Sequence, residues 1–278
     1  MPTAKANGVN LFYEVAGEGF PLVLVSGFGA DRLGWVDYQF PFFSQYYRTV
    51  IYDKRGTGQS DKPDISYTME MFADDTIGLM DALGMERAHI VGISMGGVIA
   101  QTLGINYPDR VQSLVLSNTY MGVGGSPNLE LSVRKWTGQA IQAGDFKPDL
   151  RDLLIHFTPD FILRNNEVLQ RYTSRQGTAG HILARYAEAT RATNTLPHLH
   201  KIKAPTLVLI AEEDYRMRAW CDYLHEEIKH SEFALMPGRH LSNLEFPEIY
   251  NARVLEFTLK HTPKEFARAG AAPTATKA

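Results

Sequence analysis

Short apolar runs of strand length alternate with longer amphipathic runs of helix length through most of this chain. The short runs are rich in Val, Ile and Leu and are bounded by polar residues or Gly, as expected for buried strands. The strands predicted from this pattern cover residues 9–15, 22–25, 48–52, 89–92, 111–117, 207–211 and 232–235. The helices predicted between them cover residues 35–43, 69–83, 95–107, 220–227 and 246–260. This alternation predicts an α/β fold with a mostly parallel, doubly wound sheet covered by helices on both faces.

One long stretch breaks the alternation. Residues 121–196 show no clear strand pattern and contain several short helical runs, after which Lys203-Ala-Pro205 returns the chain to the sheet. The predicted division is therefore a core of residues 1–120 and 197–262, a helical cap of residues 121–196 and a disordered tail of residues 263–278. The cap leaves the sheet at the C-terminal ends of the strands, where open α/β sheets bind their ligands.

Composition narrows the class of protein. The 278 residues are 44% hydrophobic and 21% charged, with a net charge of −3, so the basic excess of a nucleic-acid-binding protein is absent. No apolar run reaches the length of a membrane span, and the N-terminal residues lack the apolar stretch of a signal peptide. Cys221 is the single cysteine, which favours a cytoplasmic location without disulfides. The expected partner is a small molecule; the oligomeric state, including a homodimer, is left open.

The junction between the predicted strand 89–92 and the helix 95–107 carries the strongest chemical signal. It reads Gly92-Ile-Ser94-Met-Gly96. In a strand–turn–helix context this Gly-x-Ser-x-Gly pattern is typical of a nucleophile elbow. The turn is so tight that the residues two positions before and after the serine must lack a Cβ atom. Ser94 is therefore the predicted nucleophile.

Two later loops offer the base and the acid that a serine nucleophile needs. Asp214 follows the strand 207–211 and His240 follows the strand 232–235, so both belong at the sheet edge that carries Ser94. The order Ser, Asp, His along the chain is the order found in α/β hydrolases.

Several neighbouring residues compete for these roles. Glu212 and Glu213 are alternative acids, whereas Asn118, in the place where some hydrolases keep the acid, carries no charge. The rival histidines are His225 in a predicted helix, His230 at the start of a predicted strand, and His261.

Five motifs in this order resemble those of the α/β-hydrolase fold superfamily. They are Gly27-Phe-Gly29, Asp53-x-Arg55-Gly-x-Gly-x-Ser60, Gly92-x-Ser94-x-Gly96-Gly97, Glu213-Asp214 and His240-Leu-Ser-Asn-Leu-Glu-x-Pro247. Within the superfamily the chain resembles 3-oxoadipate enol-lactonases and cofactor-free haloperoxidase-like esterases, through Ser94-Met-Gly-Gly97 and residues 114–119.

The resemblance implies a Ser94–His240–Asp214 triad, an oxyanion hole made by the backbone N–H groups of Phe28 and Met95, and no cofactor. The chain departs from the superfamily at Ser26, where a histidine that props the oxyanion loop is usual.

These observations favour a serine hydrolase that cleaves a small carboxylic ester or lactone through an acyl-enzyme. A C–C bond hydrolase or a perhydrolase would use the same triad, and a receptor-like protein of this fold with little turnover is the alternative from another class. The cap residues considered for the wall of a substrate pocket are Trp136, Phe157 and Tyr186, for which helix packing is the other explanation. His198-x-His200 lacks a third ligand, so no metal site is predicted.

Overall fold

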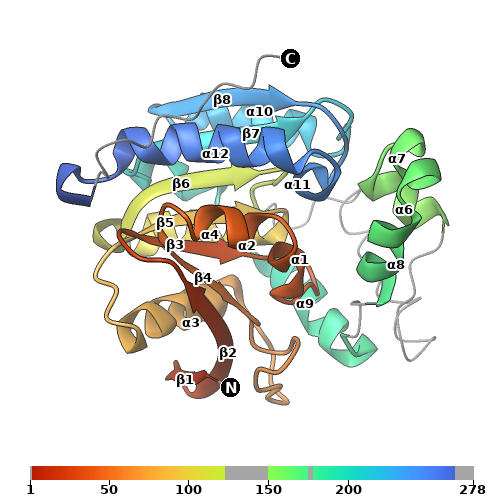
Figure 1. Ribbon diagram of the computed structural model, residues 1–278. Helices are drawn as coiled ribbons and strands as arrows, with labels where there is room; N and C mark the ends of the chain where they lie inside the picture. The colour runs from red at the N-terminus through yellow and green to blue at the C-terminus, as the bar shows by residue number, and fades with distance from the viewer. Residues whose placement is uncertain (1, 123–149, 175–177, 267–278) are drawn as a thin grey trace.

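The computed structural model describes residues 2–122, 150–174 and 178–266 (Figure 1). Within them, one eight-stranded sheet has the order β1-β2-β4-β3-β5-β6-β7-β8. β2 pairs antiparallel with both β1 and β4, and the neighbouring strands from β4 to β8 run parallel. The strands are β1 Thr3–Ala6, β2 Val9–Ala16, β3 Pro21–Val25, β4 Arg48–Tyr52, β5 Ala88–Ile93, β6 Val111–Ser117, β7 Thr206–Ala211 and β8 Ser231–Met236. The predicted α/β fold with a mostly parallel sheet is confirmed.

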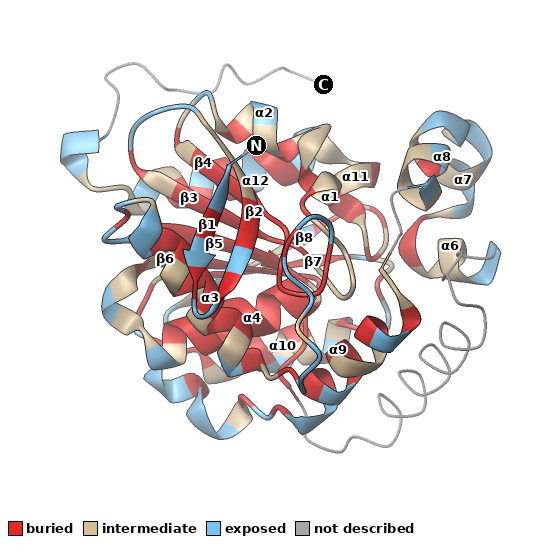
Figure 2. Cartoon of the chain, turned by 90° about the horizontal axis from the view of Figure 1, so that it is seen from below, coloured by how far each residue is buried: buried red, intermediate tan, exposed pale blue. Residues whose placement is uncertain are grey.

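Helices cover both faces of the sheet, as the mostly apolar central strands require. In β3, Val23 and Val25 join the core on one face, while Leu22 and Leu24 join the core on the other. The first face is covered by α3 Met69–Ala82, α4 Met95–Asn106 and α10 Arg218–Glu227. The second face is covered by α1 Leu33–Val36, α2 Gln39–Phe43 and α12 Pro247–His261. Figure 2 shows the buried residues concentrated in the sheet and in α4.

The structure differs from the predicted elements in two places. The short edge strand β1 was not predicted, because its two buried residues, Ala4 and Ala6, give no strong apolar pattern. The helix predicted over residues 35–43 is two short helices, α1 and α2. Pro41 has no N–H group for the carbonyl of Asp37, so one continuous helix would lose a hydrogen bond there.

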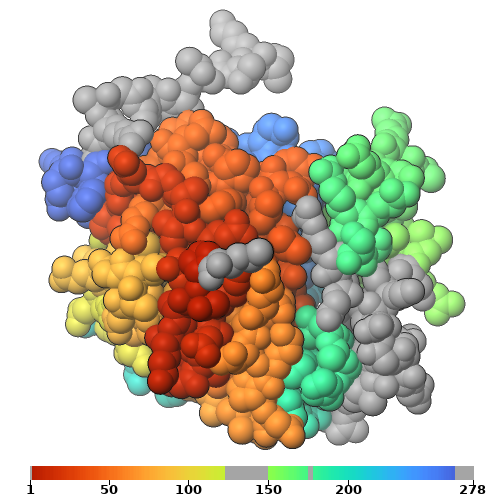
Figure 3. All heavy atoms as spheres, turned by 60° about the horizontal axis from the view of Figure 1, so that its bottom comes forward, coloured from red at the N-terminus to blue at the C-terminus, as the bar shows by residue number. Residues whose placement is uncertain are grey.

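The helical segment, by which we mean residues 150–192, contains no strand in its described part. It consists of α6 Leu150–His156, α7 Pro159–Arg164, α8 Asn166–Ser174 and α9 Gly180–Ala192. Figure 1 shows α6, α7 and α8 standing beside the sheet, and in Figure 3 they form a lobe at the side of the molecule. In contrast, α9 packs into the core through Ile182 and Tyr186. The 3-10 helix η2 Leu196–Lys201, which contains His198 and His200, leads back to β7.

Part of the predicted tail is ordered against the core. Residues Lys264–Phe266 form the 3-10 turn η3, and the ring of Phe266 lies 5.3 Å from that of Phe20. The other short elements are η1 Pro108–Arg110 and α11 Ser242–Glu245. Across the described ranges, the helices are too short or too polar to cross a membrane.

Candidate active site

Ser94 occupies a strained turn between β5 and α4. Its φ of 55° and ψ of −124° are rare for a residue with a side chain. A Cβ on Gly92 would lie 2.2 Å from the carbonyl oxygen of Gly96, and a Cβ on Gly96 would lie 2.1 Å from that of Val25. The steric reason for the two glycines in the motif is thus present in the structure. The turn is held by Ser94 N–H, which donates to Ser117 O at 2.9 Å.

Asp214 and His240 meet at the C-terminal edge of the same sheet. Asp214 follows β7 and His240 follows β8, and Asp214 Oδ2 lies 2.6 Å from His240 Nδ1. Both side chains are buried, with 1% of Asp214 and 6% of His240 exposed. A buried carboxylate on Nδ1 fixes the tautomer that leaves Nε2 free to accept a proton, the arrangement a general base needs.

The competing acids and histidines lie elsewhere. The Glu213 carboxylate pairs with Arg239 at 3.4 Å, and Glu212 is exposed. His225 belongs to α10, and its Nδ1 lies 2.8 Å from Ser231 Oγ at the start of β8. His230 precedes β8, and His261 is the last residue of α12. Asp214 is therefore the carboxylate that the fold brings to His240.

Asn118 has a bracing role that the sequence analysis missed. Its side-chain amide donates to His240 O at 3.0 Å and to Ser242 Oγ at 2.9 Å, and its carbonyl oxygen accepts from Ala211 N–H at 2.8 Å. Its φ of 43° is left-handed, which Asn tolerates better than most residues. The side chain thus ties the end of β6 to the loop of His240. An Asn directly after a buried strand was the available signal.

The loop after β3 lies against Ser94. A Cβ on Gly27 would be 3.3 Å from Ser94 Cβ, so the two backbones approach closely. Ala30 N–H donates to Gly27 O at 3.3 Å, and Gly29 has a φ of 61°, which together define a tight turn with Phe28 near its apex. Met95 is the first residue of α4, directly after Ser94. The two predicted oxyanion donors therefore belong to segments that flank the serine.

A pocket opens between this loop and α8. Its described lining includes Ala30, Asp31, Tyr38, Arg171 and Tyr172. The pocket thus joins the edge of the candidate site to the helical segment.

Two residues predicted to line a substrate pocket, Phe157 and Tyr186, are not among the described residues of that lining. Phe157 and Tyr186 are fully buried, with Phe157 stacked on Phe161 and Tyr186 edge-on to Phe28. Their role at a substrate pocket stays a prediction. Trp136 lies outside the described residues.

The helical segment reaches the candidate base through His156. The His156 and His240 rings lie 5.7 Å apart, and Leu241 N–H donates to His156 O at 3.0 Å. Burial, with the nearby His240 and Arg216, holds the pKa of His156 well below its usual value. A neutral imidazole therefore closes one side of the His240 ring.

Asp53 and Arg55 stabilise the turn that follows β4. Asp53 accepts hydrogen bonds from the backbone N–H groups of Arg32 and Gln59, and Arg55 pairs with Asp75 at 2.5 Å. The Asp53 carboxylate and the Arg55 guanidinium are therefore engaged in structural hydrogen bonds and ion pairs.

Comparison with known proteins agrees with this geometry. Residues 21–247 match the family described as the alpha/beta hydrolase fold. The chain is 29% identical over 257 residues to 3-oxoadipate enol-lactonase 2 of Acinetobacter baylyi, which covers 91% of this chain and 94% of that protein. It is 32% identical to 2-hydroxy-6-oxo-6-phenylhexa-2,4-dienoate hydrolase of Comamonas testosteroni, over 73% of this chain and 74% of that one. Among solved structures, the enol-lactonase of Burkholderia xenovorans LB400 matches with a TM-score of 0.83 and 29% identity, over 92% of this chain and 99% of that chain.

Proposed function

Because this chain belongs to the alpha/beta hydrolase fold family, we propose that it is a serine hydrolase that cleaves a small carboxylic ester or lactone. The observation that carries the proposal is the combination of a strained Ser94 with a buried Asp214–His240 pair at the same sheet edge. The resemblance to enol-lactonases over nearly the whole chain supports the substrate class.

The residues would act in two half-reactions. His240 Nε2 takes the proton of the Ser94 hydroxyl as the oxygen attacks the carbonyl carbon, and Asp214 stabilises the imidazolium. The backbone N–H groups of Phe28 and Met95 stabilise the tetrahedral oxyanion. His240 then protonates the leaving alkoxide, which departs as an alcohol or, from a lactone, stays attached to the acyl chain. Water activated by His240 attacks the acyl-enzyme, and Ser94 recovers its proton.

A C–C bond hydrolase is the second candidate. It is favoured by the 32% identity to the Comamonas testosteroni dienoate hydrolase. The same triad would serve, with a carbanionic leaving group in place of an alkoxide. The test is hydrolysis of a vinylogous diketone, measured as the loss of its visible absorbance. Faster turnover of this substrate than of p-nitrophenyl esters and simple lactones would favour the C–C bond hydrolase.

The test of the nucleophile is covalent labelling with a fluorophosphonate. Wild-type protein should label, and Ser94→Ala should neither label nor hydrolyse esters, while retaining its far-UV circular dichroism. Ser44→Ala, at the end of α2, is the matched control and should label like wild type. Labelling of Ser94→Ala at the wild-type rate would contradict the proposal. A wild-type chain that folds but never labels would favour the receptor-like alternative.

A further inference from the structure

A buried lysine next to the candidate site has no part in the triad. Lys54 follows β4, in the variable position of the Asp53-x-Arg55 motif, and only 1% of it is exposed. Lysine is rarely buried to this extent unless its amino group is paired. What the amino group of Lys54 contacts is therefore informative.

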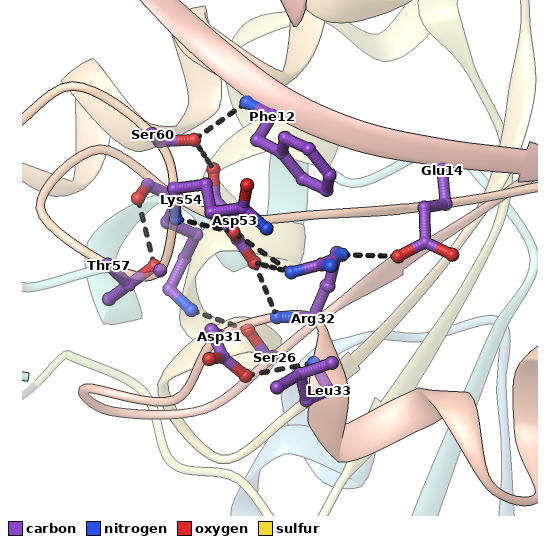
Figure 4. Close-up of polar contacts among 12 residues, drawn as sticks. Phe12, Glu14, Ser26, Asp31, Arg32, Leu33, Asp53, Lys54, Thr57 and Ser60 are labelled. Carbon is purple, nitrogen blue, oxygen red and sulfur yellow. Dashed lines mark hydrogen bonds and ion pairs between the residues drawn. The ribbon is translucent and has the colours of Figure 1, made fainter. Parts of the chain in front are cut away.

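The Lys54 amino group binds both ends of the candidate oxyanion loop. Its Nζ donates to Ser26 Oγ at 2.6 Å, as Figure 4 shows. It also donates to Ala30 O at 2.7 Å. Ser26 Oγ in turn donates to Ala30 O at 2.9 Å. Residues 27–29 lie between these two contacts, so the lysine closes the base of the turn that carries Phe28.

The charged groups around Lys54 favour this arrangement. The carboxylates of Asp31 and Asp53 act on the lysine electrostatically, and Arg32 is engaged by Asp53 and Glu14. The Tyr186 ring lies 5.9 Å from Nζ.

The protonation state of Lys54 alters the strength of these contacts rather than their number. Burial lowers the pKa of Lys54 to about 7, with the two carboxylates opposing the shift. Even the neutral amine keeps two N–H donors, enough for Ser26 Oγ and Ala30 O, while protonation adds charge assistance to both bonds.

We propose that Lys54 is a positioning residue of this hydrolase: through Ser26 Oγ and Ala30 O it holds the Phe28 N–H group in place to receive the oxyanion. The inference rests on the proposed function for its catalytic consequence. Oxyanion donors act because they are fixed before the charge develops, so a loop that drifts loses transition-state stabilisation more than substrate binding. Ser26, at the position where the superfamily usually has histidine, is then the acceptor through which the lysine acts.

The test replaces the amino group while keeping the chain length. Lys54→Met should lower kcat for ester hydrolysis by about 10- to 100-fold with little change in KM, less than the loss of a whole oxyanion donor. Binding of a trifluoromethyl ketone, which forms a tetrahedral adduct, should weaken by a similar factor. Ser26→Ala, which removes one of the two acceptors, should act in the same direction with a smaller effect. Lys62→Met is the matched control, because this exposed lysine donates to Gly58 O in the same loop region, and it should behave like wild type.

Three results would contradict the proposed role of Lys54 or separate it from the proposed function. Folded Lys54→Met with kcat and ketone affinity within twofold of wild type would overturn it. If Lys54→Met does not fold, an unchanged kcat in Ser26→Ala overturns it instead. If wild type hydrolyses neither esters nor lactones, the proposed function fails separately. Hydrogen exchange at residues 27–30 of Ser26→Ala then tests the loop contact: faster exchange supports it and unchanged exchange refutes it.

Discussion

The sheet edge and the helical segment contribute to the candidate site in opposite ways. At the sheet edge, Ser94 and Asp214 follow the buried strands β5 and β7, His240 follows the edge strand β8, and backbone hydrogen bonds fix the turns around them. In the helical segment, α6, α7 and α8 are short, and large apolar residues such as Leu163, 82% exposed, face outward.

Within this segment, α9 is packed into the core, whereas α6 and the start of α7 are tied to it around His240. Arg239 donates to Leu154 O, Leu241 N–H donates to His156 O, and the Thr158 hydroxyl and N–H both donate to Glu245. These contacts converge on residues 239–245. The candidate triad thus lies on the sheet, whereas α6 and α7 contact the loop of the candidate base; we predict that α6, α7 and α8 form a weakly attached region that affects substrate access.

After the loss of Ser94 itself, the largest effect expected at the sheet edge comes from the acid. Asp214→Asn should lower kcat by roughly 10³- to 10⁴-fold, because the amide favours the wrong histidine tautomer. Glu213→Gln is the matched control and should be mild, since Glu213 pairs with Arg239. Steady-state kinetics on a p-nitrophenyl ester measures both. A larger loss in Glu213→Gln would reassign the acid by one residue.

The same contrast explains what the sequence could predict. The elbow could be predicted because the tight turn at Ser94 requires glycines two positions before and after it. Asp214 and His240 could be predicted because they follow strands in the chain order of this fold. Lys54 and Asn118 were not recognised, because their partners lie 24 or more positions away and no periodicity encodes them. The pocket lining was likewise unpredictable, since Tyr38 and Tyr172 come from separate elements and packing alone brings them together.

Acidic pH should favour opening of the helices α6, α7 and α8 while the sheet stays folded. His156 is neutral in the closed structure, and its pKa lies well below that of an exposed histidine. The opened segment therefore binds the extra proton, so closure is fully stabilised above about pH 6.5 and weakens as the pH falls. Opening should therefore become more frequent at pH 5 than at neutral pH.

Hydrogen exchange of α6–α8, corrected for the intrinsic rate, measures this opening. His156→Phe should remove most of the pH dependence. Burial also lowers the pKa of His89 in β5, to about 3, but its protonation requires the sheet to open, so β5 amides should stay protected at pH 5. Equal pH dependence in wild type and His156→Phe would contradict the assignment.

Substrate choice should depend on the helical segment. Tyr172 lines the pocket and packs against Phe157 with ring centroids 5.4 Å apart. Tyr172→Ala should shift kcat/KM among acyl chain lengths by about 1–3 kcal/mol, the scale of an apolar pocket contact. Labelling by a small fluorophosphonate should persist, because the triad is on the sheet. Leu163→Ala, an exposed position of the same segment, should leave the preference unchanged; a shift there equal to that of Tyr172→Ala would mean that the whole segment, not the pocket, sets specificity.

The smallest expected effect compares two helix caps of the same kind. Thr68 Oγ1 accepts Met71 N–H at the start of α3 in the core, and Thr158 Oγ1 accepts Phe161 N–H at the start of α7. Losing such a cap costs about 1 kcal/mol. In Thr68→Ala the cost should appear in the global free energy of unfolding, measured with urea, because α3 packs against the sheet. Thr158→Ala also removes the hydroxyl contact with Glu245 that ties α7 to the core. Its urea midpoint should nevertheless stay near wild type while α7 amides exchange faster, because α7 opens without unfolding the core. If both variants lower the midpoint equally, the segment unfolds together with the sheet, and the weakly attached region must be regarded as part of one cooperative unit.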